Sequence, residues 1–434
     1  MVPDQTMSKS SAEPLAPGQN LVEPISCPHC WHLFPPEELR FIATSPALAF
    51  DHRLPGGGMR RFLPSRFTFT GDAIDPLGGV CTDTACPECH LKVPRLLALR
   101  DTFTVSIFGS PSSGKSFLLA AMTRMLNERL GPYRLAIDDV DGEANAIIHD
   151  YEKSLFDQPI PESPVRLLKT DLIGDWYQTV SFGNATKTLP KPFLYRVDPL
   201  HGHPAYERAR AKAQVLCIYD NAGESFEPGS EKEDSPVTRH MAKARGLIFV
   251  FDPTQETNFR SACRERSDDP QWADDRRSRQ QTLFSEAMRR ILLFRGLQPT
   301  ERVDTPMVVI LPKFDAWSFL LGDKPLPPLS REMTLKDGSS LTVFDAPAVR
   351  RVSASCRTML QKYATPMLAL IEERCAPSRV LFVPASATGC GPAGRDEEGK
   401  YFHRAGDIAP IWAEAPLLAL LNGAIPELVP SIRG

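Results

Sequence analysis

From about residue 103 onward, short apolar runs rich in β-branched residues alternate with longer amphipathic stretches. This alternation is typical of strands that alternate with helices around a mostly parallel sheet. We expect strands at residues 104–108, 193–197, 215–219, 247–251, 307–311 and 380–383. We expect helices near residues 115–129, 143–156, 275–294, 347–374 and 414–422. The predicted fold class is therefore α/β, with helices flanking the sheet.

Length and composition limit the kinds of protein that this chain can be. Its 434 residues suggest about two to three folding units. A content of 42% hydrophobic and 24% charged residues excludes collagen-like and wholly disordered chains. No apolar run approaches the roughly 18 residues of a membrane span, and a net charge of -3 does not favour nucleic acid as the main partner. The N-terminus lacks a basic segment followed by an apolar core, so we expect a cytoplasmic protein.

Shifts in composition divide the chain into three parts. Residues 1–24 are rich in Pro, Ser, Gln and Glu without apolar periodicity, and we expect a disordered leader. Residues 25–95 hold five of the ten cysteines and little regular pattern, and we expect a small zinc-ribbon-like module. Residues 100–425 carry the α/β pattern, with insertions expected near 131–213 and, as a hairpin, near 330–345.

The segment between the first expected strand and the first expected helix fits the pattern G-x-x-x-x-G-K-[ST]. It reads Gly109-Ser110-Pro111-Ser112-Ser113-Gly114-Lys115-Ser116. In this pattern the glycines let backbone N–H groups point inward at phosphate oxygens, and the helix N-terminus adds positive potential. Lys115 would reach the β- and γ-phosphates, and the Ser116 hydroxyl would ligate magnesium. The alternative is a glycine-serine turn with an incidental lysine, which the flanking strand and helix disfavour.

A second acidic motif follows the expected strand at 215–219, which ends in Asp220-Asn221-Ala222-Gly223-Glu224. A carboxylate at the carboxyl end of such a strand can hold magnesium through a water. The N–H of Gly223 could then donate to the γ-phosphate, and glycine suits a backbone that must swing when that phosphate is lost. The alternative is an ordinary exit from a strand, with Asp and Gly as turn formers.

Two further strand ends carry residues suited to reading a base. Strand 307–311 runs into Pro312-Lys313-Phe314-Asp315. The Lys313 stem would pack on the base, and Asp315 would accept hydrogen bonds from the guanine N1–H and N2 amino groups, which adenine lacks. The last strand leads to Ser386 and Ala387, where backbone groups would reach the guanine O6. The alternative for both segments is a surface turn.

Together these motifs resemble those of the Ras-like, translation-factor-related (TRAFAC) class of P-loop GTPases. The phosphate loop, D-x-x-G, a variant of N-K-x-D and a serine-alanine loop occur in the family's order, each after an expected strand. The resemblance covers about residues 103–425 and implies a Ras-like fold and a switch that binds GTP and GDP with Mg²⁺. It implies phosphate contact for Lys115 and Gly223, magnesium contact for Ser116 and Asp220, and guanine recognition for Asp315.

Three positions depart from the family's pattern. Pro312 stands where the family has Asn or Thr, so one side chain that braces the loop is missing. Glu224 stands where Ras-like enzymes often place a glutamine that orients water, and it is our candidate for that role. For the threonine of the first switch segment we favour Thr188, with Thr186 and Thr170 as alternatives.

The N-terminal module contains two C-x-x-C pairs, Cys27 with Cys30 and Cys86 with Cys89. Four thiolates from two such turns make a closed tetrahedral site suited to structural zinc. The alternatives are free or redox-active thiols, and substitute ligands close by are Cys81, His29, His32 and His90. Four arginines surround a glycine loop in this module, and we interpret them as a solvated loop rather than a nucleic-acid surface: Arg53, Arg60, Arg61 and Arg66.

The whole layout looks like that of bacterial double-GTPase-type proteins, which pair a zinc ribbon with a GTPase module and are thought to act in conflict or signalling systems. We therefore expect a magnesium-dependent GTPase with slow turnover that a protein partner or self-association speeds up. One alternative is a module that binds GTP without hydrolysing it and recruits a partner through the ribbon. A second alternative, motivated by Pro312, is an ATPase, and a third is a nucleic-acid adaptor.

Overall fold

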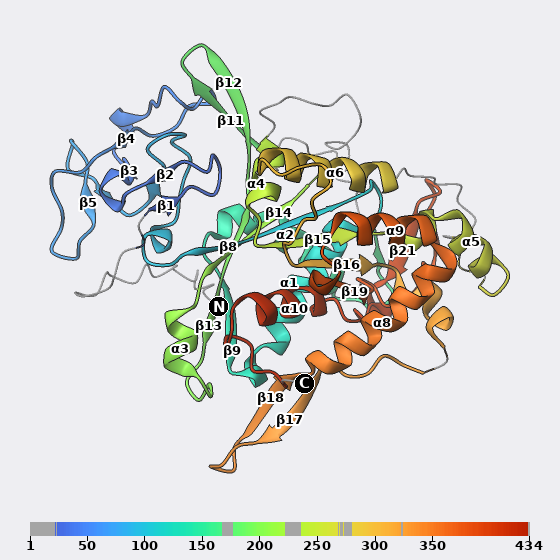
Figure 1. The fold of residues 1–434 in the computed structure, drawn as a ribbon. Coiled ribbons are helices and arrows are strands. Elements are labelled where there is room, and N and C mark those ends of the chain that lie inside the picture. Colours follow the sequence, from blue (N-terminus) through green and yellow to red (C-terminus); the bar gives the residue numbers. More distant parts are fainter. Residues whose placement is uncertain are drawn as a thin grey trace. The chain divides into compact units, whose positions relative to one another are not determined.

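The computed structural model describes residues 22, 24–166, 177–221, 236–267, 269, 272, 280–322 and 324–432. The chain separates into two compact units. The first unit comprises residues 1–101 together with 178–189, and the second comprises 102–177 together with 190–434. The β-strands and helices of both units are shown in Figure 1. No helix among the described residues is long and apolar enough to cross a membrane.

A seven-stranded mixed sheet forms the centre of the second unit. The strands lie in the order β19-β16-β15-β8-β14-β13-β9. Strand β13 runs antiparallel to both of its neighbours, and the pairs among the other strands are parallel. The bounds are β8 Thr102–Gly109, β9 Leu135–Asp139, β13 Phe193–Pro199, β14 Val215–Asp220, β15 Gly246–Val250, β16 Met307–Leu311 and β19 Val380–Pro384.

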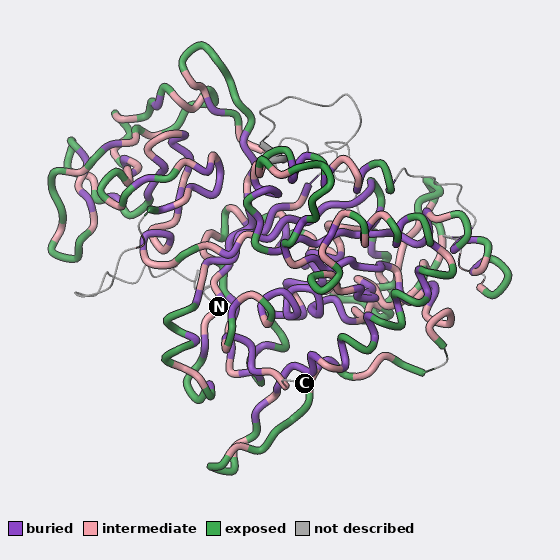
Figure 2. The backbone as a smooth tube through the Cα atoms, viewed as in Figure 1, coloured by how far each residue is buried: buried purple, intermediate pink, exposed green. Residues whose placement is uncertain are grey.

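Helices flank this sheet and bury its strands. Every residue of β15 and β16 is buried, because a strand in the middle of a covered sheet has apolar neighbours on both faces. Buried residues, drawn in purple in Figure 2, run through the middle of this unit. The helices are α1 Lys115–Arg129, α2 Gly142–Phe156, α3 Tyr206–Ala211, α4 Pro236–Lys243, α5 Thr257–Arg264, α6 Gln280–Phe294, α7 Phe314–Trp317, α8 Ala346–Tyr363, α9 Thr365–Arg374 and α10 Ala415–Ala424.

The α/β prediction is confirmed, and each of the six expected strands is present. Strand β9 was not predicted. The single helix expected over 347–374 is wrong, because the structure has two helices there, α8 and α9, separated at Ala364. Pro366 explains the break, since proline has no N–H to continue the helical hydrogen bonds and disfavours the helical conformation of the residue before it. The expected hairpin is present as β17 Ser330–Thr334 and β18 Ser340–Phe344.

One small sheet joins distant parts of the second unit. Strand β10 (Pro164–Val165) pairs with β21 (Tyr401–Arg404), which pairs in turn with β20 (Gly394–Arg395). The β20–β21 hairpin follows the loop that carries Ser386 and Ala387. Residues 164–165, which belong to the expected 131–213 insertion, therefore pair with the hairpin that follows this candidate base-reading loop.

The first unit has short strands and a small core. Its central apolar cluster contains five buried residues, namely Phe41, Ala43, Phe62, Ala73 and Cys81. The β11–β12 hairpin also belongs largely to this unit, which the sequence did not predict. The strands are β1 Ile25–Ser26, β2 Leu33–Phe34, β3 Arg40–Ile42, β4 Arg61–Phe62, β5 Ala73–Ile74, β6 Val80–Cys81, β7 Thr84–Ala85, β11 Tyr177–Phe182 and β12 Ala185–Pro190. So small a core needs another source of stability.

Candidate functional site

The candidate phosphate loop lies between the end of β8 and the start of α1. Gly109 pairs with Val250 of the neighbouring strand, and a Cβ atom at position 109 would lie 2.6 Å from the Val250 carbonyl oxygen. Only glycine allows this close approach of the two strands. The sequence pattern G-x-x-x-x-G-K-S thus coincides with a tight contact between the backbones of β8 and β15.

Left-handed backbone conformations turn the loop into the helix. Ser112 has φ 60° and Gly114 has φ 86°, and α1 begins directly afterwards at Lys115. Alternation of right- and left-handed residues aims backbone N–H groups into one concavity, which is the geometry of anion-binding nests. The Lys115 ammonium donates to the carbonyls of Gly109 and Ser110, at 3.0 Å each, so its charge is held over the loop.

Asp220 lies at the end of β14, next to the phosphate loop. Its Oδ2 accepts a hydrogen bond from the Ser116 hydroxyl at 3.3 Å. Its Oδ1 is shielded from water and has no hydrogen-bond partner among the described residues, although the residue as a whole is partly exposed. Burial raises the pKa of Asp220 to about 6, against the opposing effects of Lys115 and Ser116.

This arrangement of oxygens fits a magnesium ion. A buried carboxylate oxygen without a donor is costly unless a cation accompanies it. A carboxylate and a hydroxyl side by side are the hard oxygen ligands that Mg²⁺ prefers, usually with several waters retained. Ser116 and Asp220 are therefore the residues of this chain that would hold the ion.

The candidate base-reading residues lie together at the ends of β16 and β19. The Phe314 amide donates to the Ala385 carbonyl at 3.1 Å, which brings residues 313–315 beside Ser386 and Ala387. Asp315 as a whole is partly exposed, but its Oδ1 is shielded from water and has no hydrogen-bond partner among the described residues. Burial raises the pKa of Asp315, a hydrogen bond from Ser386 lowers it, and the Asp269 carboxylate adds a smaller upward effect.

The Lys313 ammonium is committed to a carboxylate that the sequence analysis did not single out. It lies 2.7 Å from Asp252 Oδ2 and 3.1 Å from the Thr254 hydroxyl. Asp252 follows β15 and is completely buried. The usable signal was an aspartate directly after a fully apolar strand, a position where parallel α/β sheets place functional groups. Pro312 contributes its carbonyl, which accepts from the Trp317 indole at 2.8 Å.

Several predicted residues belong to the first unit or fall outside the described residues. Gly223, Glu224 and Thr170 fall outside the described residues. Thr188 and Thr186 are exposed residues of β12, in the segment that clusters with the first unit. The phosphate-loop residues, Asp220, Lys313, Asp315 and Ser386 all belong to the second unit.

The four cysteines of the two C-x-x-C pairs converge in the first unit. Their Sγ atoms all lie within 4.8 Å of one another, and the Cys27–Cys89 and Cys30–Cys86 sulfur distances are both 3.7 Å. Zinc bound at about 2.3 Å from each sulfur of a tetrahedron places neighbouring sulfurs roughly 3.8 Å apart. The spacing of the sulfurs thus suits a structural zinc ion.

The two cysteine turns share one backbone geometry. The amides of His29 and Glu88 point at the first sulfur of their turns, at 3.4 and 3.3 Å. The residues after each pair, Trp31 and His90, have φ 57° and 61°. Repetition of one turn around four sulfurs is typical of a zinc-ribbon-like cluster.

Three of the four residues considered as substitute ligands form hydrogen bonds to other groups. His90 Nδ1 lies 2.8 Å from Asp51 Oδ1. Asp51 also accepts from the backbone amides of Arg53 and Arg61, so this carboxylate braces the turn that holds Cys89. His29 Nε2 bonds to the Lys92 carbonyl, and the Cys81 thiol bonds to the Gly79 carbonyl.

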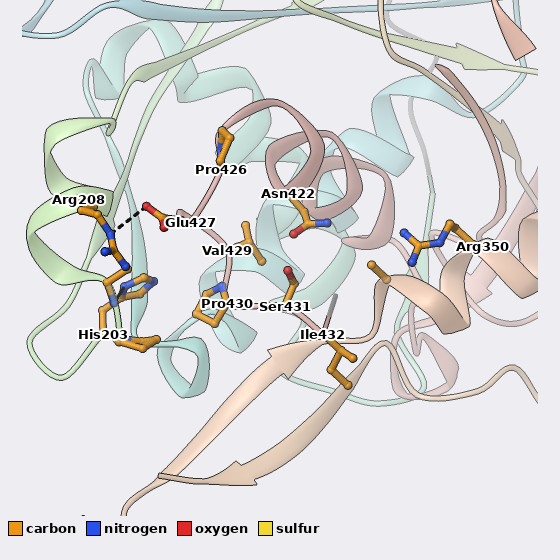
Figure 3. Close-up of a pocket in the computed structure, with 13 residues that line it drawn as sticks. His203, Arg208, Arg350, Asn422, Pro426, Glu427, Val429, Pro430, Ser431 and Ile432 are labelled. Atoms are coloured by element: carbon orange, nitrogen blue, oxygen red, sulfur yellow. Dashed lines mark hydrogen bonds and ion pairs between the residues drawn. The ribbon is translucent and has the colours of Figure 1, made fainter. Parts of the chain in front are cut away.

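Two of the larger hollows formed by described residues of the second unit are not lined by residues 109–116. One of about 920 Å³ has Asp315 in its wall, together with Tyr133 and Trp412. The other, of about 610 Å³, lies between α3, α8, α10 and the C-terminal segment (Figure 3). Arg208 pairs with Glu427 at 3.0 Å there, and His203 Nε2 bonds to the Leu428 carbonyl. Because Arg208, Glu427 and His203 are engaged in these contacts, we assign no function to the second cavity.

No protein-family model and no curated protein sequence matches the chain. The solved structures that resemble it include sup35 complexed with GDP, at 10% sequence identity and a TM-score of 0.23. That likeness covers 68% of this chain and 40% of the sup35 chain, so it spans less than half of sup35. At this TM-score the likeness carries no argument about function. What the structure shows is an α/β fold with a seven-stranded mixed sheet flanked by helices, and a zinc-ribbon-like cluster of four cysteines.

Proposed function

We propose that this protein binds guanine nucleotides with Mg²⁺ and hydrolyses GTP slowly, as a molecular switch. The observation that carries the proposal is the meeting of three features at the carboxyl edge of one sheet. These are the loop over 109–116, the Lys115 ammonium held across it, and the shielded Asp220 carboxylate beside Ser116. Each is what binding of a triphosphate and a divalent cation requires.

In this proposal the phosphates lie in the concavity of residues 109–116. The backbone N–H groups and the N-terminus of α1 would bind the negatively charged phosphate oxygens. Lys115 would move from its carbonyl partners to these oxygens. When bound, magnesium supplies neutralisation of charge on the phosphate oxygens. Ser116 and Asp220 would orient that ion, and Lys115 would stabilise charge that develops on the transferred group.

The base would be read by Asp315, with Lys313, Ser386 and Ala387 around it. The unpartnered Oδ1 of Asp315 supports guanine over adenine, because only guanine offers two donors to one carboxylate. A base that reaches Asp315 would replace the missing hydrogen bond of this shielded oxygen. Adenine would leave the Asp315 Oδ1 without a donor, and for this reason ATP ranks second to GTP as the candidate nucleotide.

Hydrolysis would proceed by in-line attack of water on the γ-phosphate. Glu224 is our candidate for orienting the water and Gly223 for contacting the γ-phosphate. A carboxylate close to a phosphate repels it, and for this reason we expect slow turnover that a protein partner or self-association accelerates. The cysteine cluster would hold zinc and give the first unit the stability to recruit that partner.

Nucleotide binding by the full-length protein tests the proposal. We expect GTP with Mg²⁺ to displace a fluorescent guanine nucleotide and ATP to do so at least about 100-fold less well. Lys115→Ala should weaken binding by at least about 100-fold, since it removes a charge from the phosphates. Lys336→Ala, at the exposed tip of the β17–β18 hairpin, is the matched control and should bind as wild type does. Equal binding by Lys115→Ala and wild type would overturn the proposal.

Turnover separates a GTPase from a module that only senses GTP. Glu224 favours the hypothesis of a module that only senses GTP, since a negative charge is poorly suited to assist attack on a phosphate. A slow enzyme releases phosphate in the wild type, and Glu224→Gln should change that rate. Absence of phosphate release from both proteins would favour the sensor. Turnover of tens per second by the purified wild-type protein without a partner would contradict the prediction of a slow enzyme.

A further inference from the structure

We infer that Gln255 is a positioning residue of the phosphate loop and that it joins this loop, through Asp252, to the base-side Lys313. The inference rests on the proposed function. It concerns a buried chain of hydrogen bonds between two loops that contact opposite ends of a nucleotide in that proposal.

Gln255 contacts the phosphate loop with both ends of its amide group. Its Oε1 accepts from the Ser110 hydroxyl at 2.9 Å, and its Nε2 donates to the Pro111 carbonyl at 3.2 Å. Ser110 and Gln255 are both buried, at 1% and 7% exposure. Two bonds from one rigid amide fix the entry of the loop from outside its own backbone, and the bond to Ser110 is buried, where water does not compete.

Asp252 is the anchor that holds Gln255 in this orientation. Its Oδ2 accepts from Gln255 Nε2 at 3.1 Å and from Lys313 Nζ at 2.7 Å. Its Oδ1 accepts from the amide and the hydroxyl of Thr254, at 2.9 and 2.7 Å. A fully buried carboxylate with an ammonium and three further donors is satisfied, so it specifies one geometry for its neighbours.

A second glutamine fixes the Asp252 backbone. Gln280, the first residue of α6, accepts from the Asp252 amide at 2.8 Å and donates to the Asp252 carbonyl at 3.0 Å. The segment after β15 is therefore clamped on both its backbone and its side chain. The segment that carries Gln255 is thus braced by several hydrogen bonds, which is the condition for it to position another loop.

The consequence is that the two ends of the nucleotide site share one support. Lys313 at the base end and Ser110 with Pro111 at the phosphate end both bond to the Asp252–Gln255 pair. Without Gln255, Pro111 would lose this side-chain bond and Ser110 would keep only its longer bond to Gln280 Oε1, at 3.5 Å. Residues 110–113 would then sample conformations whose N–H groups do not converge. Binding would then require the loop to be ordered first, which lowers the affinity.

The test compares Gln255→Ala with Gln361→Ala in the full-length protein. Gln361 is exposed on α8 and serves as the matched control. Hydrogen–deuterium exchange without nucleotide is measured on the peptide that spans 109–116, and affinity is measured with GDP and Mg²⁺. We expect Gln255→Ala to speed exchange in this peptide about tenfold and to weaken GDP binding about tenfold, or about 1.4 kcal/mol, with no change for Gln361→Ala.

Two further variants extend the test: Ser110→Ala, which is a milder change, and the double variant that combines it with Gln255→Ala. If Ser110 and Gln255 act through their shared bond, the double variant should lose no more GDP affinity than Gln255→Ala does. Fully additive losses, wild-type exchange in the 109–116 peptide, or exchange that rises equally over all of unit two would overturn the inference. If the wild type binds no nucleotide, the proposed function fails instead, and the exchange data still decide whether Gln255 positions the loop.

Discussion

Burial raises the pKa of Asp220 to about 6, well above the ordinary value near 3.8. The folded protein therefore takes up this proton more readily than the unfolded chain does. Above about pH 6 the ionised carboxylate destabilises the folded protein when no cation is bound, and protonation on acidification relieves that cost. At neutral pH the ionised side chain therefore lowers the stability of the free protein, but it can bind a cation.

We expect Asp220→Asn to stabilise the nucleotide-free protein at pH 7.5. Its free energy of unfolding should rise by an amount on the order of 1–3 kcal/mol, and its unfolding temperature should rise accordingly. The same variant should lose the Mg²⁺ dependence of nucleotide binding. Differential scanning calorimetry and magnesium titrations measure the two effects. Asp150→Asn, on an exposed position of α2, should change neither. A destabilised Asp220→Asn protein would contradict this account.

Acidification should weaken magnesium binding in the wild type. A proton and the cation compete for Asp220, so the apparent Mg²⁺ affinity should fall about tenfold per pH unit below about 6 and level off above it. Titrations of Mg²⁺ at fixed nucleotide between pH 5 and 8 measure this profile. A flat profile would show that Asp220 is not the group that meets the ion.

Asp315 should decide which base is bound. We expect Asp315→Asn to lower GTP affinity by about 100-fold or more and to leave ATP affinity nearly unchanged. Because burial raises the pKa of Asp315, GTP affinity should also fall on acidification sooner than for an ordinary carboxylate. Competition of both nucleotides against a fluorescent analogue measures the preference. The control is Asp304→Asn, whose side chain is 85% exposed.

At the scale of elements, the contact between β8 and β15 fixes where the phosphate loop begins. A methyl group at position 109 would meet the Val250 carbonyl at 2.6 Å, so the strands must separate to admit it. We expect Gly109→Ala to destabilise the protein by about 1–3 kcal/mol and to abolish nucleotide binding. Urea unfolding and nucleotide displacement measure the two effects.

Gly142→Ala is the matched control for this substitution. Gly142 is the first residue of α2, and a Cβ there would meet nothing within 4 Å. Replacing it by alanine should therefore leave nucleotide binding intact and stabilise the protein by a few tenths of a kcal/mol. Normal GDP binding by Gly109→Ala would show that the close strand contact does not govern the loop.

Strong local patterns made most elements predictable. Five or more consecutive apolar residues specify β15 and β16, and the G-x-x-x-x-G-K-S pattern specifies both the end of β8 and the start of α1 at Lys115. Strand β9 was missed because its sequence, Leu135 to Asp139, ends in two acidic residues and forms the edge of the sheet. Its register is set by pairing with β13, which is tertiary information.

The candidate site was predictable as motifs but not as a network. Lys115, Ser116 and Asp220 lie together because the carboxyl ends of adjacent parallel strands meet at one edge. The partner of Lys313 could not be inferred, because Asp252-Pro253-Thr254-Gln255 has the composition of an ordinary turn. Only the fold shows that Asp252 and Gln255 have fewer than 8% of their surface exposed and bond to residues that are distant in sequence.

At the scale of the whole molecule, the two units should respond differently to loss of metal. We expect Cys86→Ser to release zinc and unfold the first unit, because its apolar cluster is small. The second unit has its own core and should keep GDP affinity within about threefold. Zinc analysis, limited proteolysis and GDP titration measure these effects, with Cys356→Ala on α8 as the control that retains zinc. Loss of GDP binding together with zinc would show that the units depend on each other.

The β11–β12 hairpin means that the first unit is not encoded by one continuous stretch of the gene. Val180 and Leu189 of the hairpin are buried, and the Ser181 amide bonds to the Arg53 carbonyl at 2.8 Å. A polypeptide that emerges from a ribosome would therefore release the first strands of the central sheet before the cysteine-bearing unit has all its parts. A fragment that stops at residue 101 would lack these contacts, and we expect it to be less stable than one to which residues 178–189 are grafted.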